Sequence, residues 1–161
     1  YASYVYDDAF AKILVQYKEC FDEALKTVFL YPFRWWFMIR FFGYTVCYLP
    51  SSKEKIAKRG FHHLEKMFSS IPLQQADLFE KVNDFDQKNR SVEERMKMVD
   101  NIALKKHCDV PKKVLLVDDT ITTGASLLGA LHCLQDYDCK IVIYVVSVNH
   151  LWLKKPRIFG K

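Results

Sequence analysis

Apolar residues recur at helical spacing over four stretches of the chain. In 7–30 they stand three and four positions apart behind an acidic start, which predicts one amphipathic helix. Further helices are predicted over 33–41 and 125–137, and a basic helical stretch over 53–68 is interrupted at Gly60. The apolar positions of the first helix are Phe10, Ile13, Leu14, Tyr17, Phe21, Leu25 and Val28.

Uninterrupted apolar runs predict buried strands between these helices. They cover 45–49, 112–119 and 139–148, and a shorter strand is predicted over 77–82. Strands of this kind that alternate with helices indicate a mostly parallel central sheet flanked by helices. The polar run 83–97 lacks a sustained apolar face and is predicted to be an exposed, mobile loop with a short helix. The fold class is therefore α/β, and residues 1–161 suit a single domain.

Composition narrows the function only a little. The net charge is +5, which favours anionic partners such as phosphates, nucleotides or nucleic acid without selecting among them. The five cysteines are scattered and include no C-x-x-C pair, so reduced thiols and no zinc site are expected within this chain. The acidic first residues do not resemble a signal peptide, and a cytoplasmic location is expected.

The apolar segment 28–50 could be mistaken for a membrane span. It carries Arg34 and Arg40 in its middle and is interrupted by Pro32 and Gly43. A charged side chain is costly at a bilayer centre, so we predict a helix followed by a buried strand and no membrane span.

The string VLLVDDTITTGAS at 114–126 combines a strand with two adjacent acids and a threonine-rich loop. Ligands of open parallel sheets bind beyond the carboxyl ends of the strands. Backbone N–H groups, the start of the following helix and four hydroxyls would form a nest for a phosphate, and Gly124 would allow its close approach. The hydroxyls belong to Thr120, Thr122, Thr123 and Ser126.

Two carboxylates beside a phosphate nest require hydroxyl donors or a cation between them. A ribose 5-phosphate satisfies this requirement if its 2- and 3-hydroxyls donate to Asp118 and Asp119, which is our hypothesis for the pair. The structural alternative makes Asp118 a strand-end residue and Asp119 a turn or helix cap. A Walker loop is not indicated, because its G-K-[ST] sequence is missing.

The complete string resembles the phosphoribosyl pyrophosphate (PRPP) signature of type I phosphoribosyltransferases. Over 6–148 the chain resembles more narrowly the ComF family of bacterial competence-related proteins. The matching segments, in order, are YDDAFAKILVQYK at 6–18 with Lys18, YLPSS at 48–52, RGFHH at 59–63, and Gln87 with Arg95.

The resemblance implies a type I phosphoribosyltransferase-like fold and a role for each matching residue. Asp118 and Asp119 would be the catalytic pair on the ribose hydroxyls. The 5-phosphate would be held by Thr122, Thr123, Gly124, Ala125 and Ser126, with backbone groups of Thr120 and Ile121. Ser51, Ser52 and Lys53 would form the pyrophosphate turn, and Lys18, Arg59 and Arg95 would be further anion or loop contacts. Mg²⁺ would be held through PRPP, without direct protein ligands.

The chain departs from the ComF pattern at several positions. His62 and His63 replace an Asn-Gln pair, Met98 replaces an Asn, and Glu54 with Lys55 stand where arginines are usual. These changes weaken the expectation of catalysis more than that of ribose-phosphate binding. Surface or helix-packing roles are expected for the histidines, with a metal pair or acid–base site as the alternative. The zinc ribbon that often precedes ComF domains would lie outside this chain.

Trp35 and Trp36 leave two interpretations open. We expect them to pack in the core or between helices. The alternative is an exposed patch that binds a partner protein or a stacked base.

Three functions remain after this reading. The preferred one is a ComF-like accessory protein of DNA uptake and transformation, with a pocket for PRPP or ribose 5-phosphate and with single-stranded DNA or a competence helicase-like protein as partner. The second is a working Mg²⁺-dependent phosphoribosyltransferase, and the third is an α/β domain with a relic motif. Contacts to a DNA backbone are first expected at Lys18, Lys53, Lys55, Lys58 and Arg59.

Overall fold

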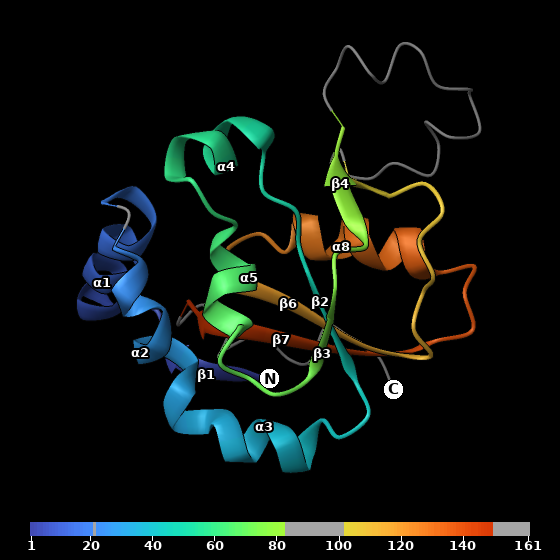
Figure 1. Ribbon diagram of the computed structural model, residues 1–161, viewed down its shortest axis with the longest axis horizontal. Helices are drawn as coiled ribbons and strands as arrows, with labels where there is room; N and C mark the ends of the chain where they lie inside the picture. The colour runs from blue at the N-terminus through green and yellow to red at the C-terminus, as the bar shows by residue number, and fades with distance from the viewer. Residues whose placement is uncertain (21, 83–101, 150–161) are drawn as a thin grey trace.

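The main sheet consists of five parallel strands in the order β1-β7-β6-β2-β3 (Figure 1). The computed structural model describes residues 1–20, 22–82 and 102–149. β4 and β5 form a separate antiparallel pair. The strands are β1 Ala2–Val5, β2 Thr45–Tyr48, β3 Gln74–Ala76, β4 Phe79–Lys81, β5 Ile102–Leu104, β6 Lys113–Ile121 and β7 Lys140–Val148. The predicted α/β class with a parallel sheet is confirmed.

The helices cover both faces of this sheet. From β1 to β2 and from β2 to β3 the chain moves one way across the sheet, and from β6 to β7 it moves the other way. Because such crossovers are right-handed, α1 to α5 lie on one face and α8 on the opposite face. The helices are α1 Asp8–Glu19, α2 Lys26–Leu30, α3 Arg34–Arg40, α4 Lys53–Arg59, α5 His63–Phe68 and α8 Ala125–Leu134, with 3₁₀ turns η1 Glu23–Leu25 and η2 Tyr31–Phe33.

The prediction of one helix over 7–30 was wrong. α1 ends at Glu19, and the chain turns before α2 begins at Lys26. In a continuous helix the 19-residue separation of Phe10 and Phe29 would span about 28 Å. Their ring centroids instead lie 5.7 Å apart, because the turn lets α2 pack back against α1. Phe29 is consequently buried, and Val28, which a single helix would have placed in the core, is exposed.

Several boundaries differ from the predicted ones. The strand predicted over 77–82 is β4, which lies outside the main sheet, and β1, β3 and β5 were not predicted. β6 continues through Ile121, so the acidic pair lies within the strand rather than at its end. α8 is three residues shorter than predicted. Gly60 does separate α4 from α5, as expected. The predicted loop 83–97 and the matching positions Gln87, Arg95 and Met98 lie outside the described residues.

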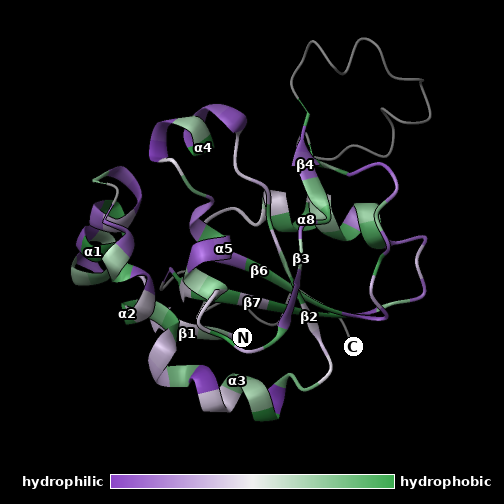
Figure 2. Cartoon of the chain, in the orientation of Figure 1, coloured by the Kyte–Doolittle hydropathy of each residue, from purple (hydrophilic) through white to green (hydrophobic). Residues whose placement is uncertain are grey.

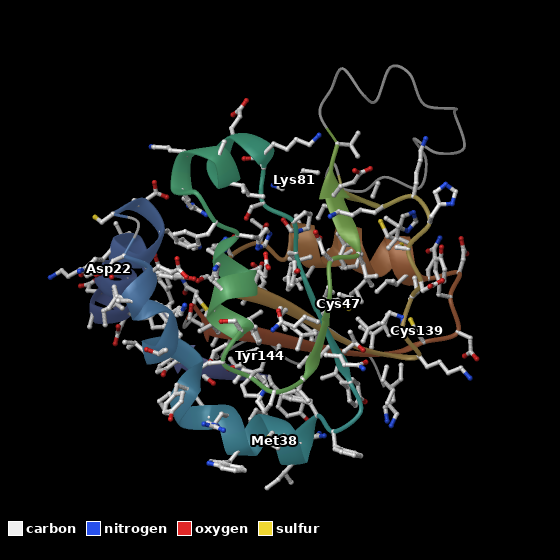
Figure 3. All side chains as sticks on the ribbon, in the orientation of Figure 1. Asp22, Met38, Cys47, Lys81, Cys139 and Tyr144 are labelled. Atoms are coloured by element: carbon white, nitrogen blue, oxygen red, sulfur yellow. The ribbon has the colours of Figure 1, made fainter. Side chains whose placement is uncertain are left out.

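Aromatic side chains dominate the core between α3, α5 and the sheet. Phe37 packs against Tyr144 with ring centroids 4.7 Å apart, and Phe68 contacts both rings. All three side chains are fully buried. Figure 2 shows the hydrophobic colouring of the central strands β6 and β7, and Figure 3 labels Tyr144 in the interior and Met38 on α3 at the edge.

The expected core packing of the two tryptophans was wrong. α3 turns Phe37 and Phe41 to the core, so Trp35 and Trp36 remain 64% and 42% exposed. Trp36 makes edge contacts with Tyr1 and Phe41 at the surface. Segment 28–50 forms short helices followed by β2, and no helix among the described residues has the length and apolar content needed to cross a bilayer.

Gly60 gives a test of this fold. Its φ is +79°, and a Cβ built there would meet no atom within 4 Å, so an alanine suffers backbone strain alone. We expect Gly60→Ala to lower the free energy of unfolding by ~1 kcal/mol, measured by urea denaturation followed by circular dichroism. Gly60→Asn should lose less, because asparagine tolerates this conformation better. Equal stability of wild type and Gly60→Ala would contradict the left-handed link.

Candidate functional site

A cavity of about 170 Å³ opens at the carboxyl ends of β2 and β6. A second hollow of about 30 Å³ follows the chain from Thr120 to Leu127 after β6. Asp118 and Ser126 line both, so the two hollows adjoin. The larger cavity is lined by Lys18, Leu49, Pro50, Ser51, Ser52, Lys55, Arg59, His63, Leu64, Lys81, Asp118, Asp119 and Ser126.

Most of the predicted site residues meet here. The parallel pairing of β2 with β6 brings the turn after β2 next to the acids, and the Leu49 N–H donates to the Val117 carbonyl at 3.1 Å. Lys53 is an exception, because it lines neither hollow and is exposed at the start of α4. Arg95 lies outside the described ranges. His63, Lys55 and Lys81 (labelled in Figure 3) line the cavity but were not predicted as site residues.

Asp119 lies at the centre of a buried ionic cluster. Its Oδ2 accepts a hydrogen bond from His63 Nε2 at 2.7 Å and pairs with the Lys18 ammonium. These partners come from α5 and α1, so one carboxylate of β6 joins two helices. The side chain of Asp119 is only 11% exposed. Both partners therefore act on it with little screening by water.

The two adjacent histidines have different roles, and the surface or helix-packing role expected of them was wrong for His63. His62 precedes α5 with an extended backbone and caps the helix, because its Nδ1 accepts from the Glu65 N–H. His63 is the first helical residue and is 7% exposed. The extended backbone at His62 lets the two rings stack with 15° between their planes, whereas neighbours on a helix would diverge.

The hydrogen bonds of His63 define its tautomer. Its Nδ1 lies 3.3 Å from Arg59 Nη1, and a guanidinium can only donate, so Nδ1 accepts, and Nε2 carries the proton and donates the hydrogen bond to Asp119. Burial lowers the pKa of His63, against the pull of Asp119. Burial and the neighbouring His63 lower the pKa of His62 to about 4. Both rings are therefore neutral at neutral pH.

The last turn of α1 is fastened to this cluster at three consecutive residues. The Tyr17 hydroxyl donates to the His63 carbonyl at 2.7 Å, and this bond is buried. Lys18 pairs with Asp119, and Glu19 pairs with Arg59 at 3.1 Å. The periodic burial of Phe10, Leu14 and Tyr17 sets the rotation of α1 that directs Lys18 to the cavity.

Asp118 differs sharply from its neighbour in its surroundings. Its Oδ1 accepts from the backbone N–H of Asp119 at 2.8 Å. Burial and the charge of Asp119 raise the pKa of Asp118 to about 7. Burial also opposes ionisation of Asp119, but the hydrogen bond from His63 and the Lys18 ammonium outweigh it and lower the pKa of Asp119. One acid is thus permanently ionised, and the other titrates near neutrality.

The loop after β6 begins at Thr122 rather than at Thr120. The Thr120 hydroxyl lies 2.8 Å from Ser147 Oγ, which in turn donates to the Asp119 carbonyl, so this hydroxyl serves the sheet. Thr120 also lines the loop hollow, so its contact with a phosphate stays a prediction. Gly124 caps α8 with φ +80° and supplies no side chain to its first turn. The Ala125 N–H donates to the Thr123 hydroxyl at 3.3 Å, and the backbone N–H groups that follow it can meet an anion.

Metal ligands are not gathered in the described part of the chain. Residues 1–20, 22–82 and 102–149 contain no group of three or more His, Cys, Asp or Glu side chains placed to hold a metal ion. All five cysteines are free thiols.

Comparison with known proteins assigns the class. Residues 56–160 match the family described as "Phosphoribosyl transferase domain". The match covers more than half of the chain, which therefore belongs to the phosphoribosyl transferase domain family.

A curated relative narrows this further. The chain is 28% identical over 141 residues to "Competence protein ComFC" of Streptococcus pneumoniae (strain ATCC BAA-255 / R6), an alignment that covers 88% of this chain and 64% of the relative. The chain spans less than two thirds of that relative's length. The predicted resemblance to a ComF-family protein with a phosphoribosyltransferase domain is confirmed.

The contrast between the two acids predicts opposite effects of the same substitution. The raised pKa of Asp118 means that wild type loses stability as pH rises through about 7. Asp118→Asn should therefore be more stable than wild type at pH 8.5, by ~2 kcal/mol, and equal to it near pH 4.

Asp119→Asn should be less stable than wild type by ~3 kcal/mol at pH 7, because Lys18 loses a buried partner. This deficit should shrink below pH 4, because Asp119 becomes protonated in the unfolded wild-type chain there while it is still ionised in the folded one. Urea denaturation at four pH values measures both variants. Shifts of the same sign at pH 8.5 would contradict the assignment.

Proposed function

We propose that the chain is a ComF-type accessory protein of DNA uptake and transformation whose pocket binds PRPP or ribose 5-phosphate. The observation that carries this proposal is the order of three features along the two adjoining hollows. An anion-accepting loop lies on one side, Asp118 lies between, and a group of cations lies on the other side. This order matches the 5-phosphate, the diol and the 1-pyrophosphate of PRPP.

The placement of the ligand follows from these features. The 5-phosphate would meet the backbone N–H groups from Thr122 to Ser126 at the start of α8. The ribose hydroxyls would donate to Asp118, whose ionised form they favour. The pyrophosphate would extend along the turn at Ser51 and Ser52 toward the cations that line the larger cavity, Lys18, Lys55, Arg59 and Lys81.

Asp119 takes a different part in this proposal from the one expected of it. Its Oδ2 is already engaged by Lys18 and His63, so it would chiefly hold these two groups in position. Lys18 lines the larger cavity and is absent from the lining of the loop hollow. It would therefore contact the pyrophosphate rather than the 5-phosphate.

Mg²⁺ fits the proposal as an ion that arrives with the ligand. Asp118 is the acid nearest the proposed diol, and Asp119 is occupied by two cationic or donor partners, so the chain would leave most coordination positions to the oxygens of PRPP. The ion would supply neutralisation of the pyrophosphate charge.

One observation favours a working phosphoribosyltransferase as the second candidate. The turn after β2 lacks the usual arginines, but Lys18 and Arg59 reach the same cavity from α1 and α4. Fixed cations near a departing pyrophosphate stabilise the charge that develops on it.

Calorimetric titration tests the placement of the ligand. We expect wild type to bind PRPP and ribose 5-phosphate, and PRPP more tightly when Mg²⁺ is added. Asp118→Asn should weaken both ligands about tenfold, because both carry the diol. Lys18→Met should weaken PRPP about tenfold and ribose 5-phosphate less than twofold.

Lys53→Met is the matched control, since it removes the same charge at a lysine that lines neither hollow. Absence of binding of both ligands by wild type would refute the proposed pocket. Equal weakening of both ligands by Lys18→Met would refute the placement of the pyrophosphate alone.

Two assays on one preparation separate the accessory protein from the enzyme. We expect the chain to bind single-stranded DNA with an affinity that falls steeply as the salt concentration rises. Lys55→Ala and Lys58→Ala should reduce this affinity, as expected for lysines that contact the phosphate backbone of DNA. We expect no pyrophosphate release from PRPP with Mg²⁺ across a panel of bases. Release with one base, together with DNA binding that does not depend on salt, would favour the enzyme.

A further inference from the structure

α3 has apolar side chains on two opposite faces. Phe37 is buried in the core, as is Phe41 directly after the helix, while Trp35 and Ile39 are exposed on α3 and Phe42 is exposed in the turn that follows. Ile39 and Phe42 are each 82% exposed. A helix that is apolar around most of its circumference is normally covered on both sides. The outward face of α3 therefore requires an explanation that core packing does not give.

The exposed apolar surface is concentrated at this edge of the molecule. Of the twelve exposed large hydrophobic side chains among the described residues, six lie between positions 28 and 42. They are Val28, Tyr31, Trp35, Trp36, Ile39 and Phe42. A hollow of about 230 Å³ beside Phe42, lined in part by Met38, Tyr44 and Leu73, continues this surface past the end of α3. Single exposed hydrophobes are common, but a cluster of this kind marks an interaction site.

The charges around this surface are of one sign. Arg34 and Arg40 are the charged residues between positions 27 and 52, a stretch without Asp or Glu. The Arg34 guanidinium lies 5.1 Å from the Trp35 ring and 5.5 Å from the Tyr31 ring. Its buried Nε has no hydrogen-bond partner in the described parts of the chain. Arg40 stacks on Tyr1 with 4.8 Å between the guanidinium carbon and the ring.

We propose that this surface, formed by Tyr31, Arg34, Trp35, Ile39, Arg40 and Phe42, binds the surface of an anionic lipid bilayer. Three properties favour a bilayer over other occupants. The most exposed side chains protrude from the helix, as insertion among lipid headgroups requires. Tryptophan and arginine are side chains suited to the headgroup region. The uniform positive charge complements phosphatidylglycerol-type headgroups.

The geometry is also compatible with the site described above. α3 lies at the lower edge of the molecule in Figure 1, and α4 lies at the upper edge. Lys55 and Arg59 of α4 line the larger cavity. A chain bound to a bilayer through α3 would thus keep this cavity accessible to water. This proposal does not depend on what the cavity binds.

Vesicle co-sedimentation tests the proposal with the whole chain. Wild type should bind vesicles that contain 30% phosphatidylglycerol at least tenfold more tightly than pure phosphatidylcholine vesicles. Lipids brominated in the upper acyl chain should quench the tryptophan fluorescence of a Trp36→Phe/Trp152→Phe variant, whose single tryptophan is Trp35 at the proposed contact.

Two substituted chains identify the surface. Trp35→Ser/Ile39→Ser/Phe42→Ser should lose binding at least tenfold without a lower unfolding midpoint, because these side chains lie outside the core. The matched control is Val15→Ser/Leu128→Ser/Tyr137→Ser, which removes three other exposed hydrophobes and should bind as wild type does. Arg34→Gln/Arg40→Gln should reduce binding of the anionic vesicles to the level of neutral ones.

Three results would overturn the proposal. The first is absence of binding of wild type to the anionic vesicles. The second is equal loss of binding in the two triple variants. The third is absence of vesicle binding together with evidence for another occupant. Quenching of Trp35 by a single-stranded oligonucleotide would assign this surface to nucleic acid. A dimer that the α3 triple variant abolishes would assign it to a second copy of the chain.

Discussion

The buried carboxylate of Asp119 holds the functional part of this molecule together. It accepts a hydrogen bond from His63 and forms an ion pair with Lys18, and it thereby connects β6 to α5 and α1. An isolated ion at this depth would be strongly disfavoured, and its pairing with a donor and a cation is what makes its burial tolerable. The arrangement brings Lys18, His63 and Asp119, which are far apart in the sequence, into one small volume and so fixes α1, α5 and β6 relative to one another.

The neighbouring acid depends on this cluster. Because Asp119 is permanently ionised, Asp118 feels a fixed negative charge in addition to its own burial, and its pKa rises to about 7. Two residues of the same type, adjacent in sequence, thus become chemically unequal. Successive side chains of a strand point to opposite faces of the sheet, so Asp119 meets Lys18 of α1 and His63 of α5 and Asp118 does not. This difference makes the pKa values of the two acids unequal.

The sequence predicted well what depends on local pattern. The unbroken apolar runs of β2, β6 and β7 are typical of parallel strands, and the D-D-x-x-T-T-G string located the loop at the end of β6. The predictions failed where distant contacts decide. The turn after Glu19 lets Phe29 pack on Phe10 and Tyr17, and the apolar pattern of 7–30 alone does not show these contacts.

The site residues that were missed have the same explanation. His63 lies 56 positions from Asp119, and nothing in its neighbourhood in the sequence indicates that its ring faces a carboxylate. The exposure of Trp35 depends on which face of α3 meets Tyr144 and Phe68, a choice that the pattern of apolar residues on both faces leaves undecided. Ser51, in the turn after β2, contacts both histidines and thereby brings them to the same strand end, and this contact too appears only in the folded chain.

The two histidines also bear on the departure from the ComF pattern of Asn-Gln at positions 62 and 63. Asparagine is a favoured helix-capping residue, and His62 performs the same capping with Nδ1. A glutamine amide has an N–H group to give and an oxygen to receive, and neutral His63 has one of each, used toward Asp119 and Arg59. His62 and His63 can therefore make the same kinds of hydrogen bond as asparagine and glutamine would at these positions. The motif is kept as a pattern of donors and acceptors, although the residue types differ.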